Sequence, residues 1–182
     1  MQSQMINGLV IGLMSVLLTA CGGGAISTHV SNERIAEYSG KWQSDCINNP
    51  NTGVALIDTT YVSGTSYTTY IDEYATSDCS DISQYTTLIE GYLSFGDDVP
   101  YASSYCDNAI EVDLTIDAIN EDGTELTSQE IKDYFDLPTN TLYDLMCTVN
   151  EELYTGDFTF YNGKSYANRP VSINHNNPLF GL

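Results

Sequence analysis

The stretch IEVDLTID, residues 110–117, decides the fold class of this chain. Its apolar side chains recur at every second position, at Ile110, Val112, Leu114 and Ile116, with acidic residues and threonine between them. Successive side chains of a β-strand point to opposite faces of a sheet, so this alternation predicts a strand with one buried face and one solvated face.

Further short strands are predicted on both sides of this stretch. They cover residues 40–46, 54–62, 67–74 and 84–95 before it, and residues 141–149 and 153–161 after it. In the strand 141–149, alternation puts one set of residues on the same side: Tyr143, Leu145, Cys147 and Val149. Turn-forming residues separate many of the predicted strands, as in SGTS at 63–66, GDDVP at 96–100 and NEDG at 120–123. About seven to eight short strands with regular turns indicate an all-β sandwich or barrel, and closure into a barrel removes exposed strand edges.

Two short helical turns and an irregular tail complete the expected secondary structure. One turn begins near Ser31, and the other covers residues 127–137, where Thr127 and Glu130 fit a capping box. The segment 168–182 is rich in Asn and Pro and is predicted to be irregular.

The charge balance excludes one class of partner. The chain has 182 residues, five of them Lys or Arg and 25 of them Asp or Glu, which gives a formal net charge of −20. Binding to a nucleic-acid backbone depends on Lys and Arg that displace counterions, so no nucleic-acid partner is expected. Direct electrostatic attraction to anionic lipid is excluded for the same reason.

The first residues are typical of an export signal. Residues 1–20 carry no charged side chain, and GLVIGLMSVLL at 8–18 is almost wholly apolar. This run is shorter than the roughly 20 residues that a membrane-spanning helix needs, and it fits the hydrophobic region of a secretory signal. Residues 1–20 are therefore predicted to be a signal peptide.

The end of this signal resembles a known processing site. Leu18-Thr19-Ala20-Cys21 resembles the bacterial lipobox, which implies cleavage before Cys21 and attachment of lipid to its thiol. Two or more acyl chains hold a protein stably on a membrane. Residues 21–32 then form a lipidated cysteine with a short tether, and Gly22, where some related lipoproteins have Asp, implies the outer membrane.

The other four cysteines predict two disulfides. An exported protein meets an oxidising compartment, where an even number of cysteines indicates disulfide bonds. Three connectivities are compatible with four cysteines. The favoured pairs are Cys46–Cys79 and Cys106–Cys147, because each closes a loop of modest length between strands that could be neighbours. Each bond is worth roughly 2–4 kcal/mol, and the absence of C-x₂₋₄-C spacing argues against zinc.

The start of the first strand resembles a second family. Gly40-Lys41-Trp42, after a short helical turn, resembles the G-x-W opening of lipocalins, although the T-D-Y motif of that family is missing. The resemblance implies a small antiparallel barrel over residues 33–182, whose floor is closed by Trp42. It also implies that Arg169 stacks on Trp42, a cation–π contact of about 0.5–2 kcal/mol.

Most of the chain after Cys21 also looks like a group of uncharacterised bacterial envelope lipoproteins. The shared features are the W-x-S-x-C start at 42–46, Cys79, the strand at 111–115, a late hairpin at 143–157 and Arg169-Pro170. This likeness supports one β domain and the pair Cys46–Cys79, whereas Cys106 and Cys147 look like an addition. It implies no activity.

No catalytic or metal-binding residues are predicted. Only two histidines occur, His29 in the tether and His175 in the tail, and no G-x-S-x-G motif is present. The acidic stretch 117–130 fails the EF-hand register, because a loop with Gly123 at position six has Ala118 first and Gln129 last.

The expected function is binding without catalysis. The leading hypothesis is a lipid-anchored module, without a cofactor, that holds a small apolar ligand or an envelope component in a barrel mouth lined by inward apolar and tyrosine side chains. The alternative is a structural or surface-interaction lipoprotein with a solid barrel and an acidic contact surface. An enzyme is the third and least favoured interpretation.

Overall fold

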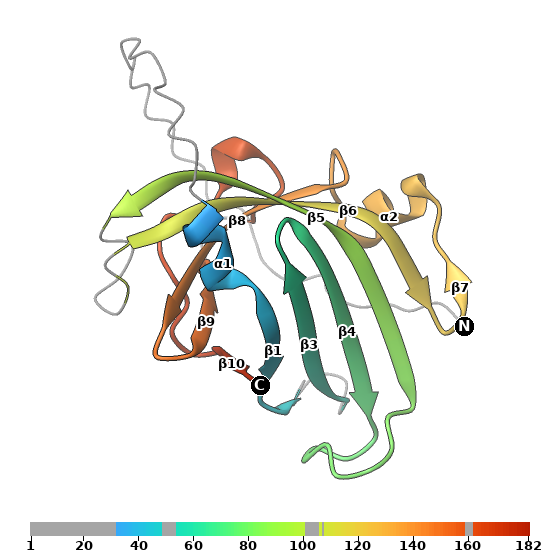
Figure 1. The fold of residues 1–182 in the computed structure, drawn as a ribbon. Coiled ribbons are helices and arrows are strands. Elements are labelled where there is room, and N and C mark those ends of the chain that lie inside the picture. Colours follow the sequence, from blue (N-terminus) through green and yellow to red (C-terminus); the bar gives the residue numbers. More distant parts are fainter. Residues whose placement is uncertain (1–31, 49–53, 101–105, 107, 159–161) are drawn as a thin grey trace, which may run out of the picture.

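The computed structural model describes residues 32–48, 54–100, 106, 108–158 and 162–182. Figure 1 shows these residues as a strongly curved antiparallel sheet with short helices at its margins. The elements are α1 (Asn32–Tyr38), β1 (Gly40–Ser44), β2 (Ile47–Asn48), β3 (Ala55–Ser63), β4 (Ser66–Tyr74), β5 (Tyr85–Pro100), β6 (Asn108–Glu121), β7 (Thr124–Glu125), α2 (Ser128–Phe135), β8 (Thr141–Val149), β9 (Glu152–Thr155), the 3₁₀ turn η1 (Tyr166–Asn168) and β10 (Leu179–Gly181).

Eight of the described strands form a closed barrel. The strand order is β1-β10-β9-β8-β6-β5-β4-β3, and β3 pairs back to β1. Every one of these pairs is antiparallel. The short strands β2 and β7 extend the sheet beside β3 and β6. The predicted all-β barrel is therefore confirmed. Because the sheet closes on itself, each of those eight strands has a neighbour on both sides along its paired residues.

The two longest strands exceed their predicted bounds. GDDVP, predicted to end a strand, lies inside β5, where Asp98 pairs with Ile110 and Pro100 with Asn108. Pro100 is tolerated because it is the last residue of the strand, where the ladder needs no further donor. In β6 the predicted inward face is confirmed, since Ile110 and Val112 are fully buried and Ile116 nearly so.

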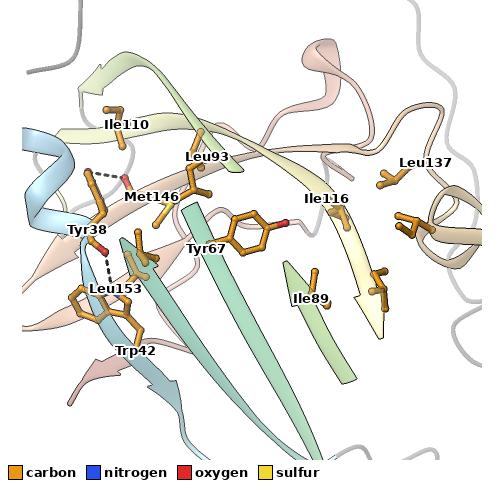
Figure 2. Packing of buried hydrophobic residues seen from close by; sticks show 14 residues of the cluster. Tyr38, Trp42, Tyr67, Ile89, Leu93, Ile110, Ile116, Leu137, Met146 and Leu153 are labelled. Carbon is orange, nitrogen blue, oxygen red and sulfur yellow. Dashed lines mark hydrogen bonds between the residues drawn. The ribbon is translucent and has the colours of Figure 1, made fainter. Parts of the chain in front are cut away.

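The main core extends across the barrel from Tyr38 of α1 to Ile131 of α2 and Leu137. Figure 2 shows Tyr38, Trp42 and Leu153 on one side of this cluster and Ile116 and Leu137 on the other. Tyr38 comes from α1 and is 1% exposed, so the predicted helical turn becomes part of the core. Burial of aromatic and aliphatic side chains of this size is the main stabilising term of a small barrel.

A second apolar cluster lies on the outer face of the barrel, beneath the C-terminal segment. The predicted alternation of β8 is confirmed there, because Leu145 and Cys147 are both buried on this face. Ile173, from the segment that was predicted to be irregular, packs on them. That segment also contains β10, which the sequence analysis missed and which links β1 to β9 to close the barrel.

Both predicted disulfides are present. Cys46 and Cys79 have Cα atoms 5.9 Å apart, and Cys106 and Cys147 have Cα atoms 6.4 Å apart. The first ties the β1–β2 connection to the loop after β4, and the second ties the start of β6 to β8. The predicted capping box of α2 is also confirmed, with Thr127 and Glu130 bonded to each other's backbone N–H groups. None of the described helices combines the length and the hydropathy needed to cross a bilayer.

Candidate functional site

The barrel has a hollow of about 550 Å³ at the end where α1 lies. Its walls come from four places that are distant in the sequence: the end of α1, the start of β1, the turn between β8 and β9, and the end of β10. Closure of the barrel brings these segments together, because β10 pairs with both β1 and β9.

Trp42 supplies the aromatic part of this hollow. Its indole Nε1 donates a hydrogen bond of 2.9 Å to the carbonyl of Tyr38, which fixes the ring against the end of α1. A Cβ at Gly40 would lie 3.7 Å from the ring, and one at Gly181 would lie 3.5 Å from it. Both are ordinary van der Waals distances, so β1 and β10 run directly beside the indole. Trp42 is only 6% exposed, so the hollow meets an edge of the ring.

The rim of the hollow is polar and carries charges of both signs. Glu37 of α1 and Glu151 of the β8–β9 turn bring carboxylates, and Lys41 brings an ammonium group. The Lys41 Nζ lies 5.7 Å from the centroid of the Tyr61 ring, which draws it toward the outer face of the barrel. Asn150 and Glu151 both have positive φ, so the tight turn presents its side chains and backbone at the edge of the hollow.

The sequence predicted only one part of this site, the tryptophan, and not the turn beside it. The G-x-W resemblance pointed to Trp42, which does lie at one end of the barrel. Asn150 and Glu151 fall between two predicted strands, but nothing in the sequence places them at the hollow, because that depends on the pairing of β10, whose short LFG segment lacks an alternating pattern. The inward apolar side chains that were predicted to line a mouth belong to the main core, and Trp42 belongs to both the core and the hollow.

Arg169 does not stack on Trp42 as the lipocalin resemblance implied. Its guanidinium lies over the rings of Tyr143 and Tyr166, 5.3 Å from each centroid. The reason is topological: Tyr143 is on the outer face of β8, whereas Trp42 belongs to the main core inside the barrel. The C-terminal segment crosses the outer face, so the arginine meets the outward aromatic side chains.

The guanidinium of Arg169 is instead held by β6 and β8. Its Nη1 donates to the carbonyls of Val112 and Asp144 at 2.8 and 2.7 Å. Its Nη2 pairs with the carboxylate of Asp113, and its Nε lies 3.7 Å from the carboxylate of Glu111. Arg169 is 7% exposed, so these contacts form in a largely dry setting and fasten the C-terminal segment to the barrel.

A buried carboxyl group completes this cluster. Asp144 accepts hydrogen bonds from the backbone N–H groups of Leu145 at 2.7 Å and Gly156 at 2.8 Å. Burial raises the pKa of Asp144 to about 6, although both N–H groups and the Arg169 charge act in the opposite direction. A Cβ at Gly156 would lie 2.4 Å from the Asp144 carboxyl oxygen, so this approach requires glycine. The contacts of this cluster are internal, which indicates a structural role.

Among the described residues, His175 lies apart from the hollow. Cys21 and His29 lie outside the described residues. His175 lies at the outer face, with its ring centroid 6.2 Å from that of Tyr154. Within the described part of the chain, no group of three or more His, Cys, Asp or Glu side chains could hold a metal ion. Neither a scan against protein-family models nor a search of curated proteins finds a match to this chain.

Proposed function

We propose that this chain is an envelope lipoprotein, anchored by lipid at Cys21 in the outer membrane, whose barrel is a non-catalytic binding module. The observation that carries the binding role is the hollow of about 550 Å³ beside Trp42. This volume lies within the roughly 300–1,000 Å³ of sites for small molecules. The anchor and the outer-membrane location rest on the lipobox resemblance and on Gly22.

The lining of the hollow favours a small ligand that is mainly apolar and has a polar end. Trp42 offers apolar contact, and Thr148 and Asn150 offer hydrogen-bonding groups near it. Binding sites of this kind combine apolar walls with a few polar groups that fix orientation. The mixed charges of the rim give no net attraction for a strongly charged ligand, which is consistent with a small apolar molecule or an apolar envelope component.

Filling the hollow should abolish binding of an apolar probe. Trp42 is the single tryptophan of the chain, so energy transfer from it to the uncharged probe N-phenyl-1-naphthylamine reports binding beside it. Thr148 lines the hollow and lies opposite Leu153 of the main core, so its side chain is on the inward face of β8. We expect the probe to bind the purified protein and Thr148→Phe to weaken this binding by about tenfold or more, a change of about 1.4 kcal/mol.

Val171→Phe is the matched control for that experiment. Val171 is 60% exposed and is not part of the hollow, so a phenylalanine there should leave probe binding unchanged. Equal binding by the wild type and Thr148→Phe would show that the hollow is not the ligand site.

Loss of the anchor should release the protein from the membrane. Each buried CH₂ contributes about 0.8 kcal/mol, so removing all acyl chains by Cys21→Ser should move the protein from the membrane fraction to the soluble fraction. Mass spectrometry of the membrane-extracted wild type should find lipid on Cys21 as the first residue. An unmodified Cys21, or cleavage at another bond, would contradict the anchor.

A structural or surface-interaction role is the second candidate function. The packed main core favours it, because large side chains such as Tyr38, Trp42 and Tyr67 occupy the interior of the barrel near α1. The net charge of −20 would then serve contact with partners in the envelope. This role predicts that Thr148→Phe leaves the biological phenotype of the protein intact.

A further inference from the structure

The barrel is closed by the shortest of its eight strands. β10 lies between β1 and β9 (Figure 1), and we name its two pairings the β10 seam. Three residues of β10 pair with β1 and two pair with β9, whereas twelve residues of β5 pair with β6. Part of a protein opens at a lower free-energy cost where few hydrogen bonds and little apolar burial hold it. Among the described strands, the β10 seam is therefore the part of the barrel wall that opens most readily.

The C-terminal segment is fastened to the barrel before it reaches β10. Arg169 is held by the buried ionic cluster, and Ile173 is 4% exposed against the outer face. Residues 175–177 are exposed, and Leu179 and Phe180 of β10 are only partly buried. A few exposed residues that change their backbone angles are enough to form a hinge. β10 can therefore leave the seam by a movement at 175–177 while Arg169 and Ile173 stay in place.

β10 lies against the indole ring of Trp42. Gly181 is directly opposite Trp42 in the ladder, and Leu179, two residues away, shares the inward face and packs against the main core. Gly181 also belongs to the wall of the hollow. While β10 is paired, Trp42 is 6% exposed and the hollow meets only an edge of its ring. Movement of β10 out of the seam would extend the hollow to the rest of the ring.

The hydrogen bonds of the seam are placed where water can replace them. The Gly181 N–H donates to the carbonyl of Glu151 at 2.9 Å, and the Leu182 N–H donates to the carbonyl of Lys41 at 3.0 Å. All four of these residues border the hollow, and Leu182 is 70% exposed. A backbone group that gains water when its bond breaks loses little free energy. The main cost of opening is therefore the apolar contact of Leu179 with the main core.

We propose that β10 is a latch, and that the small apolar ligand of the hollow binds best when this latch is open. The inference rests on the proposed binding function and adds a conformational control to the same site. A ligand with an apolar ring gains contact with the indole that the closed wall denies it, so its affinity is higher for the open state. By linkage, a change that opens the latch tightens binding, and the ligand in turn favours the open latch.

The first test needs no ligand, because the fluorescence of Trp42, the single tryptophan, reports the exposure of its own ring. Leu179→Ala removes the contact of the latch with the main core and leaves the lining of the hollow unchanged. We expect this variant to show stronger quenching of Trp42 by acrylamide and an emission maximum at longer wavelength than the wild type. In both proteins, residues 178–182 should exchange their amide hydrogens at least about tenfold faster than β5 and β6 do.

Leu126→Ala is the matched control for Leu179→Ala. Leu126 also packs, partly buried, against the main core, but it belongs to neither the latch nor the hollow. Its variant should therefore be quenched like the wild type. Equal quenching of all three proteins would overturn the latch, and so would exchange of residues 178–182 at the rate of β5 and β6, because β10 would then open only with the whole barrel.

The second test measures the affinity of the same purified full-length proteins for N-phenyl-1-naphthylamine, with a detergent blank. Leu179→Ala should bind the probe at least about threefold more tightly than the wild type, because a larger fraction of it is open. The probe should also speed hydrogen exchange of residues 178–182 in the wild type, and Leu126→Ala should bind like the wild type.

The two tests separate this inference from the proposed function. Unchanged or weaker probe binding by Leu179→Ala would overturn the preference of the ligand for the open latch, even if the wild type binds the probe well. Absence of probe binding by all three proteins would contradict the proposed function and with it this preference. The ligand-free quenching would still decide whether β10 opens.

Discussion

Replacing Arg169 by methionine should lower the free energy of unfolding by about 3–5 kcal/mol, the range for removing one partner of a buried ionic cluster. The guanidinium makes hydrogen bonds to two carbonyls and pairs with Asp113, and it is 7% exposed. Methionine fills much of the volume but leaves these acceptors without a donor. Chemical denaturation of the purified protein, followed by circular dichroism, measures the change.

Lys164→Met is the matched control for that loss. Lys164 pairs with Asp136, whose side chain is 92% exposed, and such surface pairs contribute at most about 1 kcal/mol. Arg169→Lys should fall between the two, because it keeps the charge but loses the planar fork that reaches two carbonyls at once. A change below about 1 kcal/mol for Arg169→Met would show that the cluster does not hold the C-terminal segment.

The defect of Arg169→Met should grow as the pH rises. The folded-state pKa of Asp144 is raised to about 6, above its unfolded value of about 4, so its favourable contribution is present below pH 4 and is lost as the pH rises through 6. Arg169 opposes that rise, so its removal raises the folded-state pKa further. We therefore expect a larger stability difference between variant and wild type at pH 8 than at pH 5. Adding Asp144→Asn to the variant should remove this pH-dependent part.

Period-two patterning predicted most of the barrel. The inward face of β6 and the outward face of β8 followed from alternation in the sequence, because strand geometry converts each second residue to the same face. The two disulfides also followed, since Cys46–Cys79 and Cys106–Cys147 join segments that become neighbours in the barrel. The capping box at Thr127 and Glu130 could be predicted from the local sequence alone.

The errors arose where a position depends on distant pairing. GDDVP resembles a turn, but β6 supplies partners on one side that extend β5 through it. Arg169 was assigned to Trp42 by resemblance, and only the path of the C-terminal segment over the outer face places it on Tyr143. The hollow is built from four segments that are distant in the sequence, so no single stretch of sequence contains its pattern.

Gly91→Ala should destabilise the protein by about 3 kcal/mol or more, the upper part of the range for overpacking in a core. A Cβ at Gly91 would lie 1.9 Å from the carbonyl oxygen of Thr115, which is backbone and cannot rotate away. It would also lie 3.0 Å from the Tyr67 ring, whose hydroxyl bonds the same carbonyl at 3.5 Å. The register of β5 on β6 shifts at this point, and a glycine inside a strand often marks such a bulge.

Gly96→Ala provides the matched control on the same strand. A Cβ there would lie 3.0 Å from both the Cβ and the carboxyl oxygen Oε2 of Glu111, a tight contact that a small shift relieves, so a clearly smaller loss than that of Gly91→Ala is expected. Both variants gain the same strand propensity, and the difference between their unfolding free energies therefore isolates the contact with Thr115. Equal stability of the two would show that β5 and β6 can separate at the bulge without loss. A large difference would show that the missing side chain at residue 91 has two consequences. It lets Tyr67 reach across to β6, and it lets the main core close.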